Sequence, residues 1–439
     1  MDAPRRLPVI VSAEMGYGHL RAANPLAHAL GQDVVFADRA PLATASDRKV
    51  WHAVRRAHEL MSRGSALPLV GRPVRRLLDV ATSIPSLHPY RSLAGPTAAT
   101  HVLDRMIEGG FGDALVQRLR QWGQPLITTF YAPAVVADHA GLDDVYCVVT
   151  DADINRVWVP RRPGRSRIHY LAPTRRVMQR LTAYGVPEDN LAFTGFPLPP
   201  SLVGNENLDV LRGDLAGRLV RLDPRRSFRD ECHHELTHFF PGLPATQEGC
   251  APRLTFAVGG AGAQAELIDA ALPGLREGIE SDQLRLALIA GTHPEVAERF
   301  RRSIARAGLE HRIGSGIEIL LEVDLPGYFQ AFDALLRRTD ILWTKPSELT
   351  FYAALGLPLV LADPVGVHER FNRRWIREQG VGLKQRDPRF IGGRIREWLG
   401  DGTLAAAAWS GFMRLPKFGT QRILEEAGVT RVTAGVITE

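Results

Sequence analysis

The chain has 439 residues, 45% of them hydrophobic and 23% charged, which is the composition of a packed globular protein and excludes disorder as the main state. The formal net charge is only +6, and the segment 48–78 carries +7 of it through eight basic residues and one acid, so binding of nucleic acid over the whole surface is not expected. Three widely spaced cysteines indicate no disulfide framework, and no secretion signal or run of about 18 apolar residues is present. We therefore expect a cytoplasmic protein.

Short runs rich in Val, Ile and Leu alternate with longer helical patterns in both halves of the chain. The expected strands are residues 7–12, 34–37, 126–129 and 145–150 in the first half, and 254–258, 286–289, 317–321, 341–343 and 359–361 in the second. Alternation of this kind is typical of parallel sheets covered by helices on both faces. Because the pattern restarts after Gly249, the sequence predicts an α/β protein with two doubly wound domains.

The domain limits follow from composition. The stretch before residue 252 is rich in Pro, Gly and charge and lacks a convincing strand, which is typical of a connection between domains. We expect 1–200 to form the first domain, 201–251 the interdomain connection, 252–408 the second domain, and 409–439 a C-terminal helical segment.

The loop after the first expected strand contains Gly16, Gly18 and His19. Glycines let the chain turn sharply and let a ligand approach the backbone, and open α/β sheets bind ligands at the carboxyl ends of their strands. His19 is a candidate general base because imidazole titrates near neutrality. The alternative is a strand-to-helix turn whose histidine only caps the helix.

A second glycine-rich loop, with Gly259, Gly260 and Gly262, follows the strand expected at 254–258. Small residues and N–H groups at the start of a helix can hold a diphosphate. The loop lacks the Gly-Lys-Ser/Thr ending of a Walker motif, and a purely structural turn remains the alternative.

Polar residues follow the last two expected strands. A carboxylate such as Glu348 can accept hydrogen bonds from the hydroxyls of a ribose, and Lys345 lies in the same loop. Glu369 and Asn372 are three residues apart, so on a helix they share a face and can hold the hydroxyls of a sugar. Each of them could instead be an ordinary residue of a helix start, favoured by capping or by the helix dipole.

Several of these segments resemble landmarks of one enzyme group. They are Gly-Tyr-Gly-His at 16–19, Val-Val-Thr-Asp at 148–151, Ala-Pro-Thr at 172–174, Thr-Gly-Phe-Pro at 194–197, Gly-Gly-Ala-Gly at 259–262, Thr-Lys-Pro at 344–346, Gly-Leu-Pro at 356–358 and Glu-Arg-Phe-Asn at 369–372. In this order they resemble motifs of monogalactosyldiacylglycerol synthases and processive diacylglycerol glucosyltransferases, relatives of the lipid-linked peptidoglycan GlcNAc transferase.

The resemblance implies a GT-B glycosyltransferase: two Rossmann-like domains facing a cleft, with the acceptor bound by the first and a nucleotide sugar, most often UDP-linked, by the second. It implies that His19 acts as base or orients the acceptor, with Asp151 as a second catalytic candidate. Gly259, Gly260, Gly262 and Lys345 would hold the diphosphate, Glu348 the ribose, and Glu369 and Asn372 the sugar. Neither a metal nor a further cofactor is then expected, because the loop N–H groups and a helix dipole can stabilise the leaving diphosphate.

Two other functions on this architecture stay open. A nucleotide-sugar epimerase needs no acceptor, and a non-catalytic nucleotide-sugar-binding protein would suit the segment 344–350, where the relatives have more glycine. A separate motif, His234-Glu235-Leu236-Thr237-His238, matches the HExxH pattern of zinc proteases, although it lies in the Pro-rich connection and lacks a third ligand with a signature.

The basic segment 48–78 also has two interpretations. Val50, Val54 and Ala57 recur at helical spacing with arginines between them, which indicates a core-packed helix with a solvated basic face. The same face could contact an anionic membrane surface, which suits a lipid acceptor.

Overall fold

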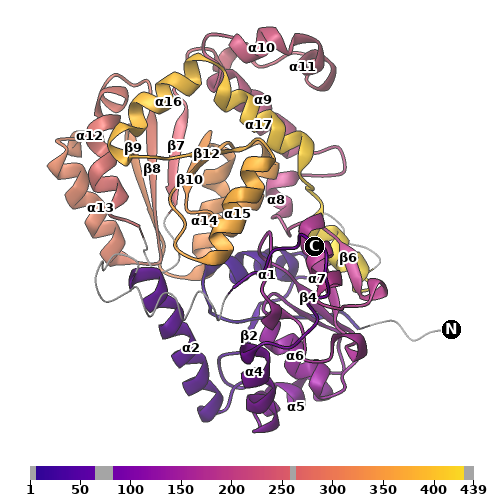
Figure 1. Ribbon diagram of the computed structural model, residues 1–439. Coiled ribbons are helices and arrows are strands. Elements are labelled where there is room, and N and C mark those ends of the chain that lie inside the picture. The colour runs from indigo at the N-terminus through magenta and orange to yellow at the C-terminus, as the bar shows by residue number, and fades with distance from the viewer. Residues whose placement is uncertain (1–5, 65–82, 258–263, 430–439) are drawn as a thin grey trace, which may run out of the picture. The chain divides into compact units, whose positions relative to one another are not determined.

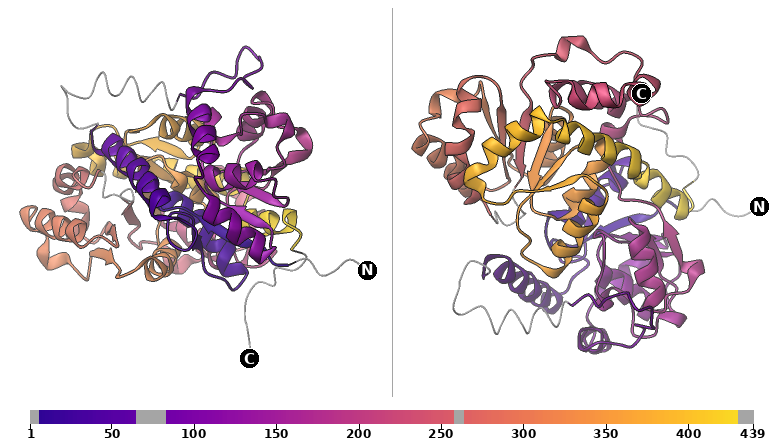
Figure 2. Two further views of the ribbon diagram at one scale, coloured as in Figure 1. Left: turned by 90° about the horizontal axis from the view of Figure 1, so that it is seen from below. Right: turned by 45° about the horizontal axis from the view of Figure 1, so that its top comes forward.

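The computed structural model describes residues 6–64, 83–257 and 264–429, except for the side chains of 57–64. The chain divides into two compact units (Figures 1 and 2). Unit 1 consists of Met1–Pro200, Val365–Asn372 and Pro416–Glu439, and unit 2 consists of Ser201–Pro364 and Arg373–Leu415.

Unit 1 contains a parallel sheet of six strands in the order β2-β1-β3-β4-β5-β6. The strands are β1 (Val9–Ser12), β2 (Val35–Phe36), β3 (Leu126–Thr128), β4 (Val145–Val148), β5 (His169–Ala172) and β6 (Leu191–Phe193). Its main helices are α1 (Tyr17–Ala29), α2 (Ala45–Gly64), α4 (Ala98–Glu108), α5 (Asp113–Trp122), α6 (Tyr131–His139), α7 (Arg175–Ala183) and α18 (Gly419–Glu426). Helices cover both faces of the sheet (Figure 1).

Alternate residues of the strands face opposite sides of this sheet, and both sides are apolar. Val9 and Val11 join one hydrophobic core, whereas Ile10 joins a second core that includes Leu26 of α1 and Leu424 of α18. Burial on both faces is the reason the strands read as continuous apolar runs. It also places the last described helix of the chain beside the first one, and the yellow C-terminal helix can be followed to this position in Figure 2.

Unit 2 contains a second parallel sheet of six strands, in the order β12-β11-β10-β7-β8-β9. The strands are β7 (Arg253–Ala257), β8 (Arg285–Gly291), β9 (Ile317–Leu321), β10 (Ile341–Thr344), β11 (Leu359–Leu361) and β12 (Gly382–Lys384). Helices α12 (Leu267–Glu280), α13 (Pro294–Arg306), α14 (Leu325–Arg337), α16 (Ile391–Gly400) and α17 (Thr403–Arg414), with the 3-10 helix η6 (Glu348–Leu355), belong to this unit. Helix α15 (Val367–Glu378) is divided, because its residues up to Asn372 belong to unit 1 and those from Arg373 on to unit 2. The order is that of a dinucleotide-binding Rossmann sheet.

The prediction of two doubly wound, Rossmann-like domains is therefore confirmed. The first segment of unit 1 ends at residue 200. The expected connection 201–251 belongs to unit 2, where it forms α8 (Pro200–Val203) from residue 201 on, α9 (Asp209–Arg221), α10 (Ser227–Glu231) and α11 (His233–Phe239). The expected C-terminal segment is divided, because residues up to 415 belong to unit 2 and those from 416 on to unit 1. Within the described ranges, no helix combines the length and the apolar character that a membrane crossing requires.

Candidate functional sites at the two switch points

The order of strands locates a ligand crevice in each sheet. In unit 1 the chain leaves β1 toward β2 on one side and returns to β3 on the other, so the order reverses between β1 and β3. In unit 2 the reversal lies between β7 and β10. Doubly wound proteins bind their ligands outside the carboxyl ends of the strands at such switch points. The loops after β1, β3, β7 and β10 are therefore the places to look for functional side chains.

His19 lies at the switch point of unit 1, in the first turn of α1. Gly16 precedes this helix with φ 122°, a backbone conformation that favours glycine. The Nδ1 atom of His19 lies 2.7 Å from the carbonyl oxygen of Thr129, directly after β3, and 3.2 Å from Oγ1 of Thr150, after β4. A carbonyl can only accept, so Nδ1 carries the proton and the neutral ring has its lone pair on Nε2. This is the tautomer that a general base needs.

Two hydroxyl groups fix the backbone around this histidine. Thr129 Oγ1 donates to the carbonyl of His19 at 3.0 Å and shares a 2.9 Å hydrogen bond with Ser12 Oγ at the end of β1. Ser12 and Thr129 are fully buried. The ends of β1 and β3 and the start of α1 are thus held together by a closed set of hydrogen bonds, which positions His19 on rigid elements.

Aromatic rings surround His19. The ring of Phe130 meets the imidazole edge-on at 4.8 Å between centroids, and Trp158 lies 6.3 Å away. Tyr131, at the start of α6, stands 5.5 Å from Trp158, and burial raises the pKa of its phenol to about 12. The phenol therefore stays protonated at neutral pH. One part of the surroundings of His19 is thus formed by aromatic rings.

Asp151 and Asn372 are 221 residues apart in the sequence and lie together in unit 1. The Nδ2 atom of Asn372 donates to Oδ1 of Asp151 at 2.9 Å, and its Oδ1 accepts from the N–H of Ala152 at 2.7 Å. Asn372 is fully buried. Both ends of its amide are engaged by unit 1, so in this arrangement Asn372 holds the segment after β4. Its predicted role toward a sugar stays a prediction.

A buried network of ion pairs also stabilises the segment that follows β4. Both carboxylate oxygens of Asp153 accept from Arg180, at 2.8 and 3.0 Å, and Oδ2 also accepts from Arg176 at 2.7 Å. Asp153 and Arg180 are inaccessible to solvent. The guanidinium of Arg176 lies 5.4 Å from the ring of Phe371, the neighbour of Asn372. Bidentate, fully buried pairing of this kind restricts the backbone that carries Asp151.

Glu369 is also buried, with 2% of its surface exposed. Its Oε2 accepts a hydrogen bond from the N–H of Val365 at 2.7 Å, which satisfies a backbone donor before the first turn of α15. This is the capping role that the sequence left open for Glu369, and the role toward a sugar stays untested.

At the switch point of unit 2, β10 ends at Thr344 and is followed by Lys345 and Glu348. Lys345 is half-buried, and Glu348 begins η6 with 8% of its surface exposed. The structure thus places both predicted donor-binding residues at the carboxyl end of the strand next to β7. The predicted diphosphate-binding residues Gly259, Gly260 and Gly262 lie outside the described residues.

The far end of η6 is held by a buried arginine that the sequence analysis missed. Arg218 of α9 is 1% exposed and donates to the carbonyls of Leu355 at 2.7 Å and Thr339 at 2.8 Å. Burial lowers the pKa of its guanidinium to about 10. Because carbonyl acceptors at the end of η6 and before β10 are tied to one side chain, the loop that carries Glu348 is attached to a rigid frame.

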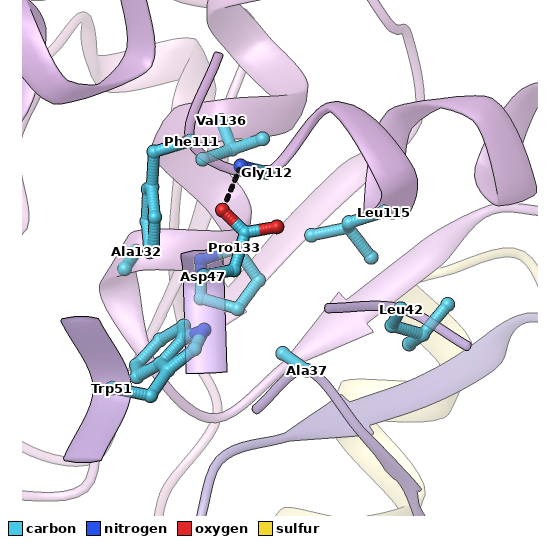
Figure 3. Close-up of a pocket in the computed structure, with 10 residues that line it drawn as sticks. All are labelled: Ala37, Leu42, Asp47, Trp51, Phe111, Gly112, Leu115, Ala132, Pro133 and Val136. Carbon is cyan, nitrogen blue, oxygen red and sulfur yellow. Dashed lines mark hydrogen bonds between the residues drawn. The ribbon is translucent and has the colours of Figure 1, made fainter. Parts of the chain in front are cut away.

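A small pocket in unit 1 lies beside α2 and is lined mainly by apolar side chains (Figure 3). Asp47 is the acidic residue in it, and its carboxylate accepts from the N–H and the hydroxyl of Thr44, at 2.9 and 2.7 Å, and from Gly112 N–H at 3.4 Å. The N–H of Asp47 donates back to Thr44 Oγ1 at 3.1 Å, so the pair forms a capping box at the start of α2. The hydrogen bonds of the Asp47 carboxylate stabilise the start of α2, and we assign no ligand to the pocket.

The HExxH motif lies on α11, a helix of seven residues. Within the described ranges, no group of three or more His, Cys, Asp or Glu side chains is arranged to hold a metal ion.

The chain thus has two Rossmann-like units, and each has buried polar side chains at its switch point. This defines the class of the protein as a two-domain, doubly wound α/β protein. No protein-family model matches the chain. The chain is 21% identical over 238 residues to a processive diacylglycerol β-glucosyltransferase of Bacillus subtilis (strain 168), covering 54% of this chain and 49% of that protein. A protein of the same name from Bacillus cereus (strain AH187) is 23% identical over 288 residues, 63% of this chain and 60% of the relative.

The chain thus spans between about half and three fifths of the curated relatives that it matches. The resemblance to processive diacylglycerol glucosyltransferases that the sequence motifs indicated is confirmed. Among solved structures, the S. aureus MnaA–UDP structure (TM-score 0.49, 13% identity, 96% of this chain and 95% of that one) and Acinetobacter baumannii MurG (TM-score 0.49, 13% identity, 96% and 99%) are similar.

Proposed function

We propose that this protein is a GT-B glycosyltransferase that moves a sugar from a UDP-sugar to a hydroxyl group of a lipid acceptor. The observation that carries the proposal is the geometry of His19. Its Nδ1 lies 2.7 Å from the Thr129 carbonyl at a sheet switch point, so the neutral ring has its lone pair on Nε2, the atom that would take the proton of an attacking hydroxyl. An inert helix cap would not need a fixed tautomer.

The donor belongs to unit 2 in this proposal. A nucleotide across the carboxyl ends of β7 and β10 would meet Lys345 and Glu348, with the ammonium suited to phosphate and the carboxylate to ribose hydroxyls. Gly259, Gly260 and Gly262 complete the proposed diphosphate site. Main-chain N–H groups and a helix dipole would stabilise the leaving diphosphate, so the reaction as proposed uses no metal.

The acceptor belongs to unit 1. The curated relatives are named for transfer to diacylglycerol, and here Phe130, Tyr131 and Trp158 make the surroundings of His19 apolar. Asp151, fixed by Asn372, is the second candidate for proton transfer or for orienting the acceptor.

A lipid acceptor requires access to a membrane surface, and we propose that α2 provides it as a peripheral contact. Trp51 of α2 is buried, whereas Arg48, Lys49 and Arg56 are exposed and Val54 is 42% exposed. Basic residues near an anionic surface contribute about 1 kcal/mol each. Residues 65–78 of the basic segment 48–78 lie outside the described residues.

The test is product analysis with UDP-hexoses and vesicles that contain diacylglycerol. We expect a glycolipid and free UDP to appear together, and only when both substrates are present. Sugar conversion with the UDP-sugar alone would instead identify an epimerase, and binding of a UDP-sugar without turnover in any acceptor mixture would identify a non-catalytic binding protein.

A further inference from the structure

One buried side chain at the donor end of unit 2 is left unsatisfied. Thr344 is the last residue of β10 and is 1% exposed, yet its hydroxyl has no hydrogen-bond partner among the residues that the structure describes. Eleven threonines are buried among the described residues, and each of the other ten makes a hydroxyl hydrogen bond. A buried hydroxyl without a partner costs free energy, so a native protein keeps one for a reason outside its own packing.

The position of Thr344 indicates which ligand group would satisfy this hydroxyl. In the sheet register Thr344 stands beside Ala257, the last residue of β7, so Thr344 lies at the switch point of unit 2. Its own carbonyl is engaged by the N–H of Ala362 at 3.0 Å, and the next residue is the half-buried cation Lys345. A hydroxyl donor next to an ammonium group at the carboxyl end of a Rossmann strand matches the chemistry of a phosphate oxygen.

We infer that the Thr344 hydroxyl is a hydrogen-bond donor to a phosphate oxygen of the bound nucleotide. The inference rests on the proposed function and adds a residue to its donor site. In the sequence Thr344 is recognisable only as part of the Thr-Lys-Pro motif at 344–346, because a missing hydrogen bond is visible only in three dimensions.

The inference predicts opposite effects on ligand binding and on stability. Thr344→Val keeps the shape of the side chain and removes the hydroxyl, so UDP affinity should fall about ten- to a hundredfold, the range of one hydrogen bond to a charged group. The thermal midpoint without ligand should stay the same or rise, because an unsatisfied polar group has been removed. Thr344→Ser, which keeps the hydroxyl, should retain the UDP affinity.

Thr339 provides a matched control, because it lies just before the other end of β10 and is also fully buried. Its hydroxyl donates to the carbonyl of Leu335 at 2.9 Å and shares a 2.8 Å bond with Thr255. Thr339→Val should therefore lower the thermal midpoint and leave UDP affinity unchanged.

Calorimetric titration with UDP, displacement of UDP by uridine, and thermal unfolding of the three variants test the inference. Loss of UDP affinity in Thr344→Val, with uridine affinity unchanged, is the expected result. Wild-type UDP affinity in Thr344→Val, or an equal loss for uridine, would overturn the phosphate assignment while leaving the glycosyltransferase proposal intact. If the unaltered protein bound no UDP, the inference and the proposed UDP donor would both be wrong.

Discussion

His19 meets the geometric requirement for a general base through one short hydrogen bond. We expect His19→Ala to reduce turnover by about a hundredfold or more, the range of lost acid–base catalysis, while UDP affinity changes less than about twofold. His19→Asn is the matched variant, because its amide can still donate to the Thr129 carbonyl but offers no ring nitrogen in place of Nε2. Steady-state kinetics should therefore show both variants to be equally slow. Turnover near that of the unaltered protein in His19→Asn would assign the histidine to helix capping.

The residues at the two switch points differ in how far sequence alone could predict them. Gly16, His19, Lys345 and Glu348 follow apolar runs directly, so strand position was enough to place them at the carboxyl edges of the sheets. The pairing of Asn372 with the segment after β4 could not be predicted, because a hydrogen bond across 221 residues leaves no local pattern.

The segment that leads into α18 contains a half-buried lysine. Lys417 lies two residues before this helix, and burial lowers the pKa of its ammonium group from 10.5 to about 8. Between pH 8 and 10.5 the unfolded chain binds more protons than the folded one, so this residue's contribution to the free energy of unfolding rises with pH. At neutral pH the buried charge is a cost.

We expect Lys417→Met to raise the free energy of unfolding by about 1–3 kcal/mol at pH 7, with the gain shrinking toward zero by pH 10.5. The exposed Lys384, at the end of β12, is the control, and Lys384→Met should change stability by less than about 0.5 kcal/mol. Urea unfolding of both variants at pH 7 and pH 10 measures this. A gain that is equal at the two pH values would show that the charge of Lys417 is not its source.

The structure also refines which charges of α2 to test for membrane contact. Arg55 Nη1 lies 3.4 Å from the carboxylate of Glu14, and Arg39 Nη2 lies 2.7 Å from the same carboxylate. A change at Arg55 would therefore disturb the loop that leads to His19. Arg48 and Arg56 are exposed and can be reversed without touching this loop.

We expect Arg48→Glu with Arg56→Glu to weaken binding to phosphatidylglycerol vesicles at least tenfold at low salt, and salt to reduce the difference. The same reversal at Arg301 and Arg302, exposed on α13 of unit 2, controls for net charge and should bind at least ten times more tightly than the α2 variant. Co-sedimentation gives both affinities. Equal loss in the two double variants would mean that overall charge, and not α2, governs binding.

Strands that the sequence analysis missed share a simple physical cause. β6 and β12 are edge strands of only three residues and are not fully buried. The three residues of β6 are apolar but too few to show a strand pattern, and β12 has Leu383 between a glycine and a lysine. β5 is an interior strand, but it has only four residues and begins with His169. Most of the remaining strands are buried on both faces and were predicted from their apolar runs, although β2 and β9 are only partly buried.

At the scale of the whole molecule, we propose different functions for the two units. Unit 2 has the order and the polar edge of a nucleotide-binding sheet, and unit 1 holds the histidine in apolar surroundings. If this division is right, substitutions in unit 2 should affect donor binding, and substitutions in unit 1 should affect transfer. The segment 365–372 is the exception, because it belongs to unit 1 and contains Glu369 and Asn372, the residues predicted to hold the sugar of the donor.

Calorimetric titration of UDP into the unaltered protein, Glu348→Ala and His19→Ala tests this division most directly. A hydrogen bond to a charged group is worth roughly 1.5–3 kcal/mol, so Glu348→Ala should weaken UDP binding about ten- to a hundredfold, whereas His19→Ala should leave it within about twofold. Glu348→Gln, which keeps an oxygen acceptor, should fall between the two. Unchanged UDP affinity in Glu348→Ala would contradict the account, because the segment after β10 would then not be a donor site.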